Sequence, residues 1–283
     1  MIDLHAHTTA SDGSFSPREL VELAKRSGIT VLGITDHDTV DGINEAERTG
    51  RERGVEIVPG LEFSTEYEPG TLHILGYEID PTYQPLLAEL AKRRRDRDER
   101  NPKIIQALRN LGLDLSIEEV IAAAGGDVVG RPHIGKVIVQ KGYASSVSDA
   151  FARYLDKGRP AFVRQEKIAP ARAIELITKA GGVATLAHPY QTKLTGDLLE
   201  RFVEQLGEQG LQGIEVYYSR HTPEMIEHYR SIALRYNLVE TGGSDFHGTP
   251  KPDIQLGTGL GNLNVPPDTI RRLRERRDQI RRR

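Results

Sequence analysis

The first residues of the chain alternate between apolar and polar side chains. In the stretch M-I-D-L-H-A-H every second residue is apolar, which is the period of a β-strand. His5 and His7 therefore point to the same side, where both imidazoles can reach one metal ion. Asp12 follows in the polar turn S-D-G-S, close enough to add a carboxylate. This stretch alone is also compatible with two histidines on the protein surface, so the rest of the chain has to decide between the two interpretations.

Short apolar runs alternate with helical patterns on both sides of a central segment. Further strands are expected over 31–35, 55–58, 72–77, 182–187, 213–218 and 238–241. Helices are expected from Ser16 onward, over 41–53, over 223–236 and over 267–282. This alternation is typical of α/β proteins, which form either a parallel barrel or an open, doubly wound sheet.

The strand pattern is interrupted between residues 81 and 159. Apolar spacing there predicts only helices, over 86–111, from 116 onward, over 132–141 and over 146–155. We therefore expect the α/β part to be formed by residues 1–80 and 160–283. Residues 81–159 are expected to form an inserted helical subdomain that acts as a lid or specificity element.

Polar residues gather where the predicted strands end. They are His5, His7, His37, Glu62, His188, Asp245 and His247. In parallel α/β folds the carboxyl ends of the strands form the ligand-binding face. An open sheet would spread these residues along a line, whereas a closed barrel brings them into one cup. We therefore expect a distorted seven-stranded (β/α)7 barrel, with His73 inside its fourth strand.

Composition narrows the kind of site. The chain has 283 residues, 37% of them hydrophobic and 28% charged, with a net charge of −3, which gives no general attraction to nucleic acid. Cysteine is absent, so a metal ion would be held by His, Asp and Glu, a ligand set that suits Mn, Fe or Zn. No apolar segment is long enough to span a membrane, and the first strand leaves no room for a signal peptide, so we expect a cytoplasmic protein.

Two stretches are strongly basic, residues 92–100 and 271–283. Acidic side chains are interleaved with the basic ones, and aromatic residues are missing from both stretches. This pattern favours solvated helix faces over patches that contact RNA.

Six short motifs occur along the chain in the order H-A-H-T, T-D-H-D, G-L-E-F-S, L-H-I-L-G-Y, A-H-P and G-S-D-F-H. Together they resemble the polymerase and histidinol phosphatase (PHP) family. The resemblance covers about residues 1–80 and 180–250, and none of the motifs is missing. It implies a distorted barrel of seven strands with up to three metal ions at its mouth.

The resemblance also implies how the ligands are shared. One ion would be held by His5, His7, Glu62 and Asp245, a second by Glu62, His73 and His188, and a third by Asp12, His37 and His247. Glu62 would bridge two of two to three divalent ions, whose shared hydroxide would attack phosphorus. Glu62, His188 and His247 are therefore the catalytic candidates. The general acid stays open, because either histidine could serve only if metal binding left it free.

Two segments of the insertion, G-R-P-H-I at 130–134 and Y-L-D-K-G-R-P at 154–160, resemble one branch of this family. That branch acts on nucleoside 3′,5′-bisphosphates and on short RNA from its 5′ end. The resemblance implies that Arg131 and His133 contact phosphate and that Lys157 and Arg159 assist. A guanidinium can hold phosphate with two charge-assisted hydrogen bonds. The alternative is an ordinary helix start followed by surface charge.

The expected function is therefore a metal-dependent phosphoesterase whose substrate is a small phosphorylated nucleotide or short RNA. No obligate protein partner is evident. Within the family the main rival is a histidinol-phosphate phosphatase, which the insertion favours less. A rival of another class is the non-catalytic structural PHP module found in some DNA polymerases, but here no ligand is missing and no polymerase is attached.

Overall fold

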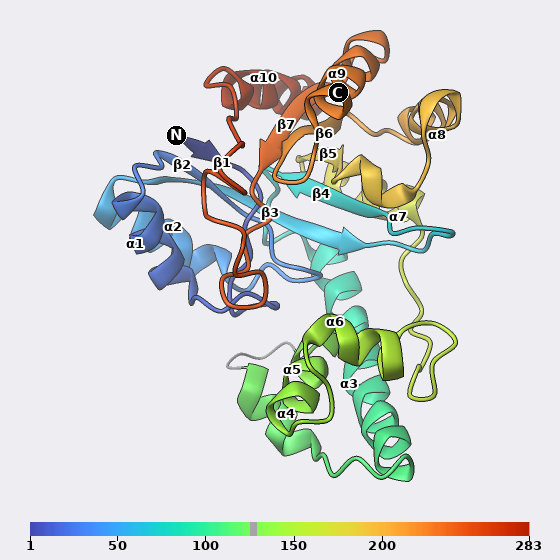
Figure 1. The fold of residues 1–283 in the computed structure, drawn as a ribbon. Coiled ribbons are helices and arrows are strands. Elements are labelled where there is room, and N and C mark those ends of the chain that lie inside the picture. Colours follow the sequence, from blue (N-terminus) through green and yellow to red (C-terminus); the bar gives the residue numbers. More distant parts are fainter. Residues whose placement is uncertain (125–128, 283) are drawn as a thin grey trace.

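The computed structural model describes residues 1–124 and 129–282. Its centre is a seven-stranded sheet in which every strand pairs with its neighbour in sequence (Figure 1). The strands are β1 (Ile2–Asp3), β2 (Val31–Ile34), β3 (Glu56–Ser64), β4 (His73–Tyr77), β5 (Val183–Leu186), β6 (Gly213–Tyr218) and β7 (Val239–Gly243). The Leu4 amide donates to the Gly242 carbonyl at 3.2 Å, and Ala6 bridges Phe246 in parallel. These contacts bring the first strand against the last, so the sheet is a nearly closed barrel, as predicted.

Strand β4 runs against both of its neighbours. It pairs antiparallel with β3 and with β5, whereas all other pairs are parallel. The expectation of a wholly parallel barrel was wrong here, because the short connection between β3 and β4 permits only a hairpin, and a parallel pair needs a longer crossover. The reversal places His73, the first residue of β4, beside Ser64, the last residue of β3.

Helices cover the outside of the barrel (Figure 1). They are α1 (Pro17–Arg26), α2 (Ile43–Arg53), α7 (Pro170–Lys179), α8 (Gly196–Glu208), α9 (Pro223–Arg235) and α10 (Thr269–Arg281). The sequence analysis had not anticipated α7 and α8. Helix α1 begins with a capping box between Ser16 and Glu19 and buries its apolar face. Helix α10 is held by Arg274 and Arg277, which pair with Glu78 at 2.9 and 2.6 Å. This part of the basic C-terminus is therefore not simply solvated.

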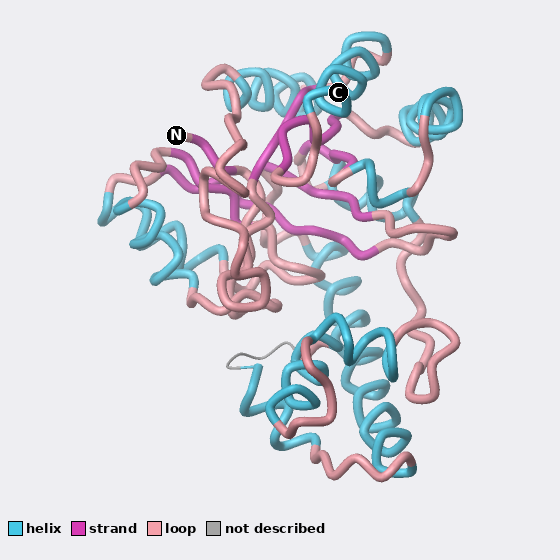
Figure 2. The backbone as a smooth tube through the Cα atoms, viewed as in Figure 1, coloured by secondary structure: helices cyan, strands magenta, loops and turns pink. Residues whose placement is uncertain are grey.

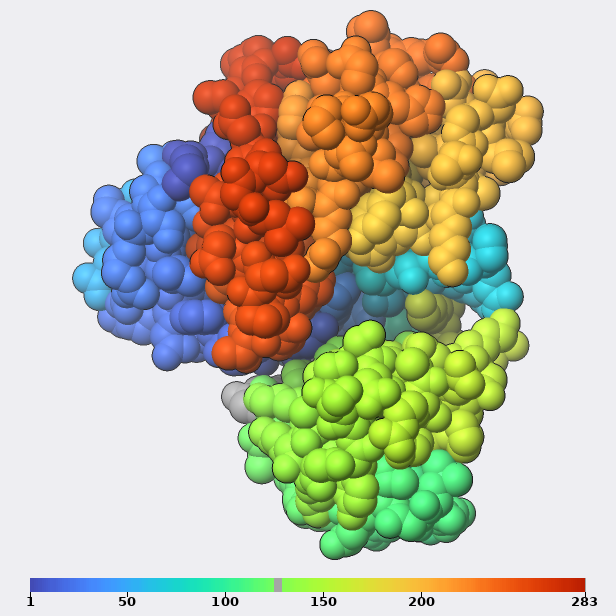
Figure 3. Space-filling view, viewed as in Figure 1, coloured from blue at the N-terminus to red at the C-terminus, as the bar shows by residue number. Residues whose placement is uncertain are grey.

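The central segment contains helices and no strand in its described residues (Figure 2). The helices are α3 (Gln84–Asn110), α4 (Ile117–Ala124), α5 (Arg131–Gln140) and α6 (Val147–Ala150), with a π-helical turn over Phe151–Leu155. In the space-filling view most of this segment forms a lobe below the barrel (Figure 3).

Helix α3 belongs to both parts of the molecule. Leu86 and Leu90, near its start, pack in the core of the barrel. Ile104 and Leu108, near its end, pack in a separate hydrophobic core within the insertion. Helix α3 therefore fixes the position of the insertion relative to the barrel mouth. The side chains of α3 that lie between the two cores face both the barrel and the insertion.

Candidate metal centre

The structure brings all nine predicted metal ligands together at one end of the barrel. They follow β1 (His5, His7 and Asp12), follow β2 (His37), lie on β3 (Glu62), begin β4 (His73), follow β5 (His188) and follow β7 (Asp245 and His247). His5 and His7 lie beyond the two-residue strand, with ring centroids 5.2 Å apart. Both residues are held by backbone hydrogen bonds to the segment after β7, since the His5 carbonyl accepts from the Asp245 amide at 2.8 Å and the His7 amide donates to the Phe246 carbonyl at 2.9 Å.

Glu62 lies at the centre of this group and is fully buried. Its two carboxylate oxygens lie within 3.3 Å of ring nitrogens of His5, His7, His37, His73 and His188. Burial by itself raises the pKa of a carboxyl group, but the neighbouring histidines, His37 first, hold the pKa of Glu62 well below its usual value. The side chain is therefore an ionised carboxylate whose two oxygens face different imidazoles, which is the geometry of a bridging ligand.

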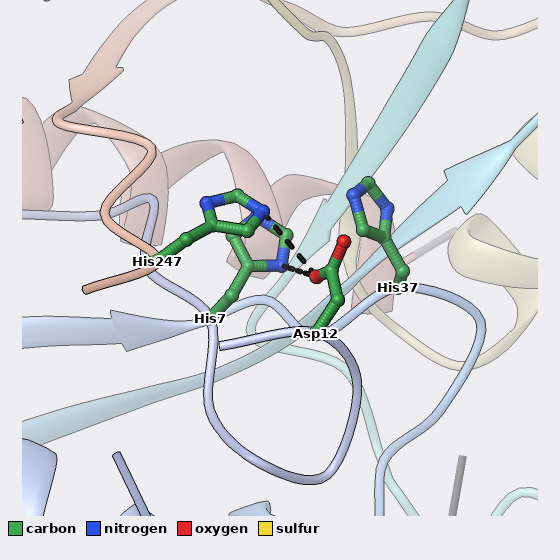
Figure 4. Close-up of side chains that lie close together, drawn as sticks. All are labelled: His7, Asp12, His37 and His247. Atoms are coloured by element: carbon green, nitrogen blue, oxygen red, sulfur yellow. Dashed lines mark ion pairs between the residues drawn. The ribbon is translucent and has the colours of Figure 1, made fainter. Parts of the chain in front are cut away.

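Three groups of ligand atoms are compact enough to hold one ion each. In each group the atoms lie within 4.8 Å of one another: His5, His7, Glu62 and Asp245; His7, Asp12, His37 and His247; and His37, Glu62 and His73. The first group matches the set implied by the family resemblance. The second adds His7 to the expected set, and Figure 4 shows its side chains converging on Asp12. The third contains His37 where His188 was expected, although His188 Nε2 is also 2.9 Å from Glu62.

The residues fit divalent metal ions. Both ring nitrogens of His7 and Nδ1 of His37 are buried and make no hydrogen bond within the described residues. An unsatisfied buried nitrogen is costly, and a cation would satisfy it. Burial also lowers the pKa of His73 to about 4 despite the charge of Glu62, so this imidazole is neutral, the form that ligates metals. Imidazole and carboxylate together suit first-row transition metals.

A fully buried glutamate on β6, Glu215, supports two of these histidines. Its Oε1 accepts a hydrogen bond from His5 Nδ1 at 2.9 Å, and its Oε2 accepts one from the backbone amide of His188 at 2.8 Å. The first bond leaves the His5 Nε2 lone pair facing Glu62 and Asp245, as a ligand requires. The second holds His188, whose φ of 26° is strained for a residue other than glycine. The sequence analysis missed Glu215, and its one signal is a lone carboxylate in the apolar run G-I-E-V-Y-Y.

Asp245 is oriented in the same way by other partners. Its Oδ2 accepts hydrogen bonds from Lys251 Nζ at 2.6 Å and from the Tyr218 hydroxyl at 2.9 Å. Its Oδ1 lies 3.3 Å from His7 Nε2 and 3.6 Å from His5 Nε2. One oxygen is thus held by the protein while the other faces the histidines.

A cavity of about 260 Å³ lies between the barrel mouth and the insertion. The mouth contributes Asp12, His37 and His73 to its lining, and the insertion contributes Arg97, Arg100 and Arg131. Candidate metal ligands and arginines thus line the same cavity.

The predicted phosphate-binding residues divide into two groups. Arg131, the first residue of α5, lines the cavity, donates to the Leu155 carbonyl at 3.3 Å and lies 5.7 Å from the ring centroid of Phe151. His133 lines a neighbouring groove of about 700 Å³, and its Nδ1 accepts the Gly130 amide at 3.0 Å. Lys157 is exposed and pairs with Glu68. Arg159 is exposed as well, and neither of the last two lines the cavity, so their roles stay predictions.

Three arginines of the charged stretch 92–100 are buried against the cavity. Arg93, Arg97 and Arg100 are only 3%, 7% and 6% exposed, so the interpretation of this stretch as a solvated helix face was wrong on this side. Arg93 donates to the Glu166 carbonyl at 2.6 Å, and Arg97 pairs with Asp38 at 2.9 Å. The spacing of the three arginines in the sequence could have predicted this burial, because positions i, i+4 and i+7 share one face of a helix.

Fold and site together define a seven-stranded barrel with a cluster of candidate metal ligands at its mouth. The sequence pattern of the PHP domain matches residues 3–165. The 5′-3′ exoribonuclease of Haemophilus influenzae is 37% identical over 258 residues, which cover 91% of this chain and 93% of that protein. The chain belongs to the PHP family.

Two further similarities extend over almost the whole chain. The 3′,5′-nucleoside bisphosphate phosphatase of Chromobacterium violaceum is 31% identical over 257 residues, 90% of both proteins. A crystal structure from Bifidobacterium adolescentis, assigned provisionally to the metal-dependent phosphoesterases, superposes with a TM-score of 0.86 at 31% identity and covers 97% of this chain and 96% of that one. Within the described residues, no helix is long and apolar enough to cross a membrane.

Proposed function

We propose that this protein is a metal-dependent phosphoesterase that hydrolyses phosphate esters of nucleotides, either nucleoside 3′,5′-bisphosphates or short 5′-phosphorylated RNA. The observation that carries the proposal is the cavity in which candidate metal ligands of the barrel face arginines of the insertion. This combination suits a phosphate ester, because metal ions activate it for hydrolysis and guanidinium groups neutralise its oxygens. The two relatives act, by their names, on RNA and on nucleoside bisphosphates.

The nine side chains at the mouth would hold two to three divalent ions of Mn, Fe or Zn. When bound, such ions supply Lewis-acid charge and lower the pKa of water to near neutrality. Glu62 would join two of these sites, since its oxygens face separate imidazoles. Glu215 would keep His5 in the tautomer whose Nε2 can bind a metal ion. Glu215 accepts a hydrogen bond from Nδ1 and is not itself one of the nine candidate ligands.

Arg131 is the side chain best placed to bind the phosphoryl oxygens. Its guanidinium is held at one corner by the Leu155 carbonyl, and it lies against Phe151. This leaves further N–H donors for a phosphate in the cavity. The role of His133 would be limited to its Nε2, since its Nδ1 already accepts the Gly130 amide.

The two candidate catalytic histidines differ in what they can do. His247 Nδ1 lies 2.9 Å from the carbonyl of Asp245, to which it donates, so its Nε2 lone pair is directed toward Asp12. This arrangement favours a ligand role for His247. His188 keeps one ring nitrogen, Nδ1, without a hydrogen bond within the described residues. Of the two, His188 therefore retains the site at which a proton could be held.

The rival functions fit the site less well. Histidinol phosphate carries an ammonium group, which a cavity wall rich in arginine would repel. A structural module without catalysis would not need nine candidate ligands, three of which (His7, His37 and His188) have buried ring nitrogens without a hydrogen bond within the described residues.

Metal analysis and a comparison of substrates test the proposal. We expect the purified protein to contain two to three transition-metal ions per chain and to hydrolyse adenosine 3′,5′-bisphosphate or a short 5′-phosphorylated RNA faster than histidinol phosphate. A metal-free protein of unchanged stability would support the structural module instead. A preference for histidinol phosphate would instead indicate a histidinol-phosphate phosphatase.

A further inference from the structure

The second group of candidate ligands depends on a turn outside the barrel strands. We refer to this group as the Asp12 group, and its members are His7, Asp12, His37 and His247 (Figure 4). Asp12 lies in a turn well beyond the end of β1 at Asp3. The side chains of Asp12 and His37 are 17% and 21% exposed, whereas every member of the group around His5 and Asp245 is buried. Something other than the strands must therefore hold Asp12 in place.

Asp36, the first aspartate of the motif T-D-H-D, fastens this turn. It lies just after β2 and is buried. Its Oδ1 accepts hydrogen bonds from the Thr8 amide at 2.7 Å and from the Ser11 hydroxyl at 2.6 Å, and its Oδ2 accepts one from the Thr8 hydroxyl at 2.8 Å. One carboxylate therefore holds both ends of the segment 8–11, which separates His7 from Asp12.

Asp36 is itself anchored beside the central ligand. Its backbone carbonyl accepts a hydrogen bond from the Glu62 amide at 3.1 Å, and His37, the next residue, forms a parallel bridge with Glu62. The hydrogen bonds of Asp36 thus reach the chain neighbours of three members of the Asp12 group. Thr8 follows His7, Ser11 precedes Asp12, and Asp36 precedes His37.

The chemistry of these contacts requires a carboxylate. Asp36 belongs to none of the three groups that could hold an ion, and its oxygens already accept three hydrogen bonds. The Thr8 hydroxyl accepts the Ala10 amide at 3.0 Å, so its own hydrogen is free for Asp36. An asparagine would offer one acceptor oxygen, without charge, to donors that now share two.

We propose that Asp36 is a positioning residue that assembles the Asp12 group and thereby decides whether the centre holds three ions or two. This inference rests on the proposed function, since it assumes divalent ions at the mouth. The other two groups do not contain Asp12. Their members keep hydrogen bonds of their own, such as that from His5 to Glu215 and that from the His7 amide to the Phe246 carbonyl, so they should persist without this fastening.

Asp36→Asn tests the proposal through metal binding. Purified Asp36→Asn should contain one ion fewer per chain than the unmodified protein, by mass spectrometry. In calorimetric titrations of metal-depleted protein with Mn²⁺, the affinity of one site should fall between about tenfold and a hundredfold, as is usual when a partner outside the ligand set is lost. Ser11→Ala removes one of the three hydrogen bonds and should weaken the same site by about tenfold.

A double-mutant cycle with Asp12→Asn identifies the site that is affected. Asp12→Asn removes a candidate ligand of the Asp12 group directly. If Asp36 acts through that group, the double variant should bind no less metal than Asp12→Asn alone, because the same ion is lost only once. If Asp36 only supports the fold, its substitution should weaken every site, and the two losses should add.

Thr82→Ala is the matched control. The Thr82 hydroxyl donates to Asp80 Oδ1 at 2.6 Å, the same distance as the bond from Ser11 to Asp36, but both residues are exposed and follow the end of β4, away from the ligands. Its removal should leave metal content and affinity unchanged.

Metal binding and hydrolysis are measured separately, so the two proposals can fail separately. Unchanged metal binding in Asp36→Asn, an equal loss at all sites, or an unmodified protein that binds only two ions and keeps both in Asp12→Asn would each overturn the role of Asp36. Hydrolysis of a nucleotide ester would then still support the proposed function. Loss of one ion in Asp36→Asn, together with an unmodified protein that hydrolyses no phosphate ester, would leave Asp36 as a positioning residue and overturn the proposed function.

Discussion

The barrel mouth and the insertion face each other across one cavity and carry opposite kinds of charge. The mouth presents histidines and ionised carboxylates, whereas the insertion presents buried arginines. Neither side is fully satisfied within the described residues, since buried imidazole nitrogens on one side have no hydrogen bond, and Arg100 and Arg131 on the other side pair with no carboxylate. Metal cations complement the first surface and phosphate anions complement the second. The site is therefore divided between two parts of the molecule, the mouth being complementary to metal cations and the insertion side to phosphate anions.

The two sides also differ in how they are held. The ligands are fixed by strand ends and by buried hydrogen bonds such as that from His5 to Glu215. The arginines of the insertion depend on α3, which is anchored in two separate cores. Changes at the mouth should therefore abolish chemistry, whereas changes in the insertion should alter substrate binding, and the predictions below test that division.

Glu62→Gln should have the largest effect. The substitution removes the charge shared by five imidazoles and should lower kcat by roughly a thousandfold or more, because several kcal/mol of transition-state stabilisation depend on it. Metal content by mass spectrometry should fall in parallel. Glu204→Gln on the exposed face of α8 is the control and should change neither. A Glu62→Gln enzyme that keeps more than about a tenth of kcat would contradict a bridging role.

The strand pattern of the sequence predicted that the nine candidate ligands gather at the mouth, but it did not predict that Arg97, Arg100 and Lys167 line one cavity, and the reason is physical. Histidine is rare, so its recurrence at strand ends signals a metal site even without a structure. Arginine and lysine are common on helix surfaces, and Arg97 and Arg100 are separated from Lys167 by most of the insertion. Only the packing of α3 against the segment 165–167 shows that their charges meet. The reversed direction of β4 was also missed, because an apolar run has no direction of its own.

Removing the insertion should separate metal binding from substrate recognition. A chain that joins Asp80 to Pro160 through a short linker should still bind metal but lose its substrate selectivity, since it lacks Arg97, Arg100 and Arg131. The structure sharpens this experiment, because Leu86 and Leu90 of α3 belong to the barrel core. A variant that joins Ala91 to Pro160 should therefore be the more stable of the two by several kcal/mol, which urea unfolding would measure. Global unfolding of both with loss of metal would show that the parts share one core.

Arg131→Ala should reduce catalysis by less than Glu62→Gln. If Arg131 grips the reacting phosphoryl group, kcat/KM should fall roughly a hundredfold for bisphosphate and monophosphate alike. Arg131→Lys should recover little, because an ammonium cannot reproduce two parallel hydrogen bonds. Arg172→Ala on α7, where the arginine is exposed and pairs with Glu175, should have no effect. A loss confined to the bisphosphate would place Arg131 with the second phosphate.

Lys157 and Arg159 should give the smallest effects, and these depend on substrate length. Neither residue lines the cavity, so we do not expect a mononucleotide bound in the cavity to reach them. A short RNA extends beyond the cavity, and there a lysine or arginine can contact a later phosphate, which contributes weakly and in a salt-dependent way. Replacing both residues by Met should therefore lower kcat/KM about threefold for a 5′-phosphorylated oligoribonucleotide at low salt, and the difference should vanish as salt is raised. The measurement is a salt titration of kcat/KM for RNA and for adenosine 3′,5′-bisphosphate side by side. Equal losses for both substrates would mean that these side chains reach the cavity after all, and no loss for either would leave RNA contacts to the groove that His133 lines.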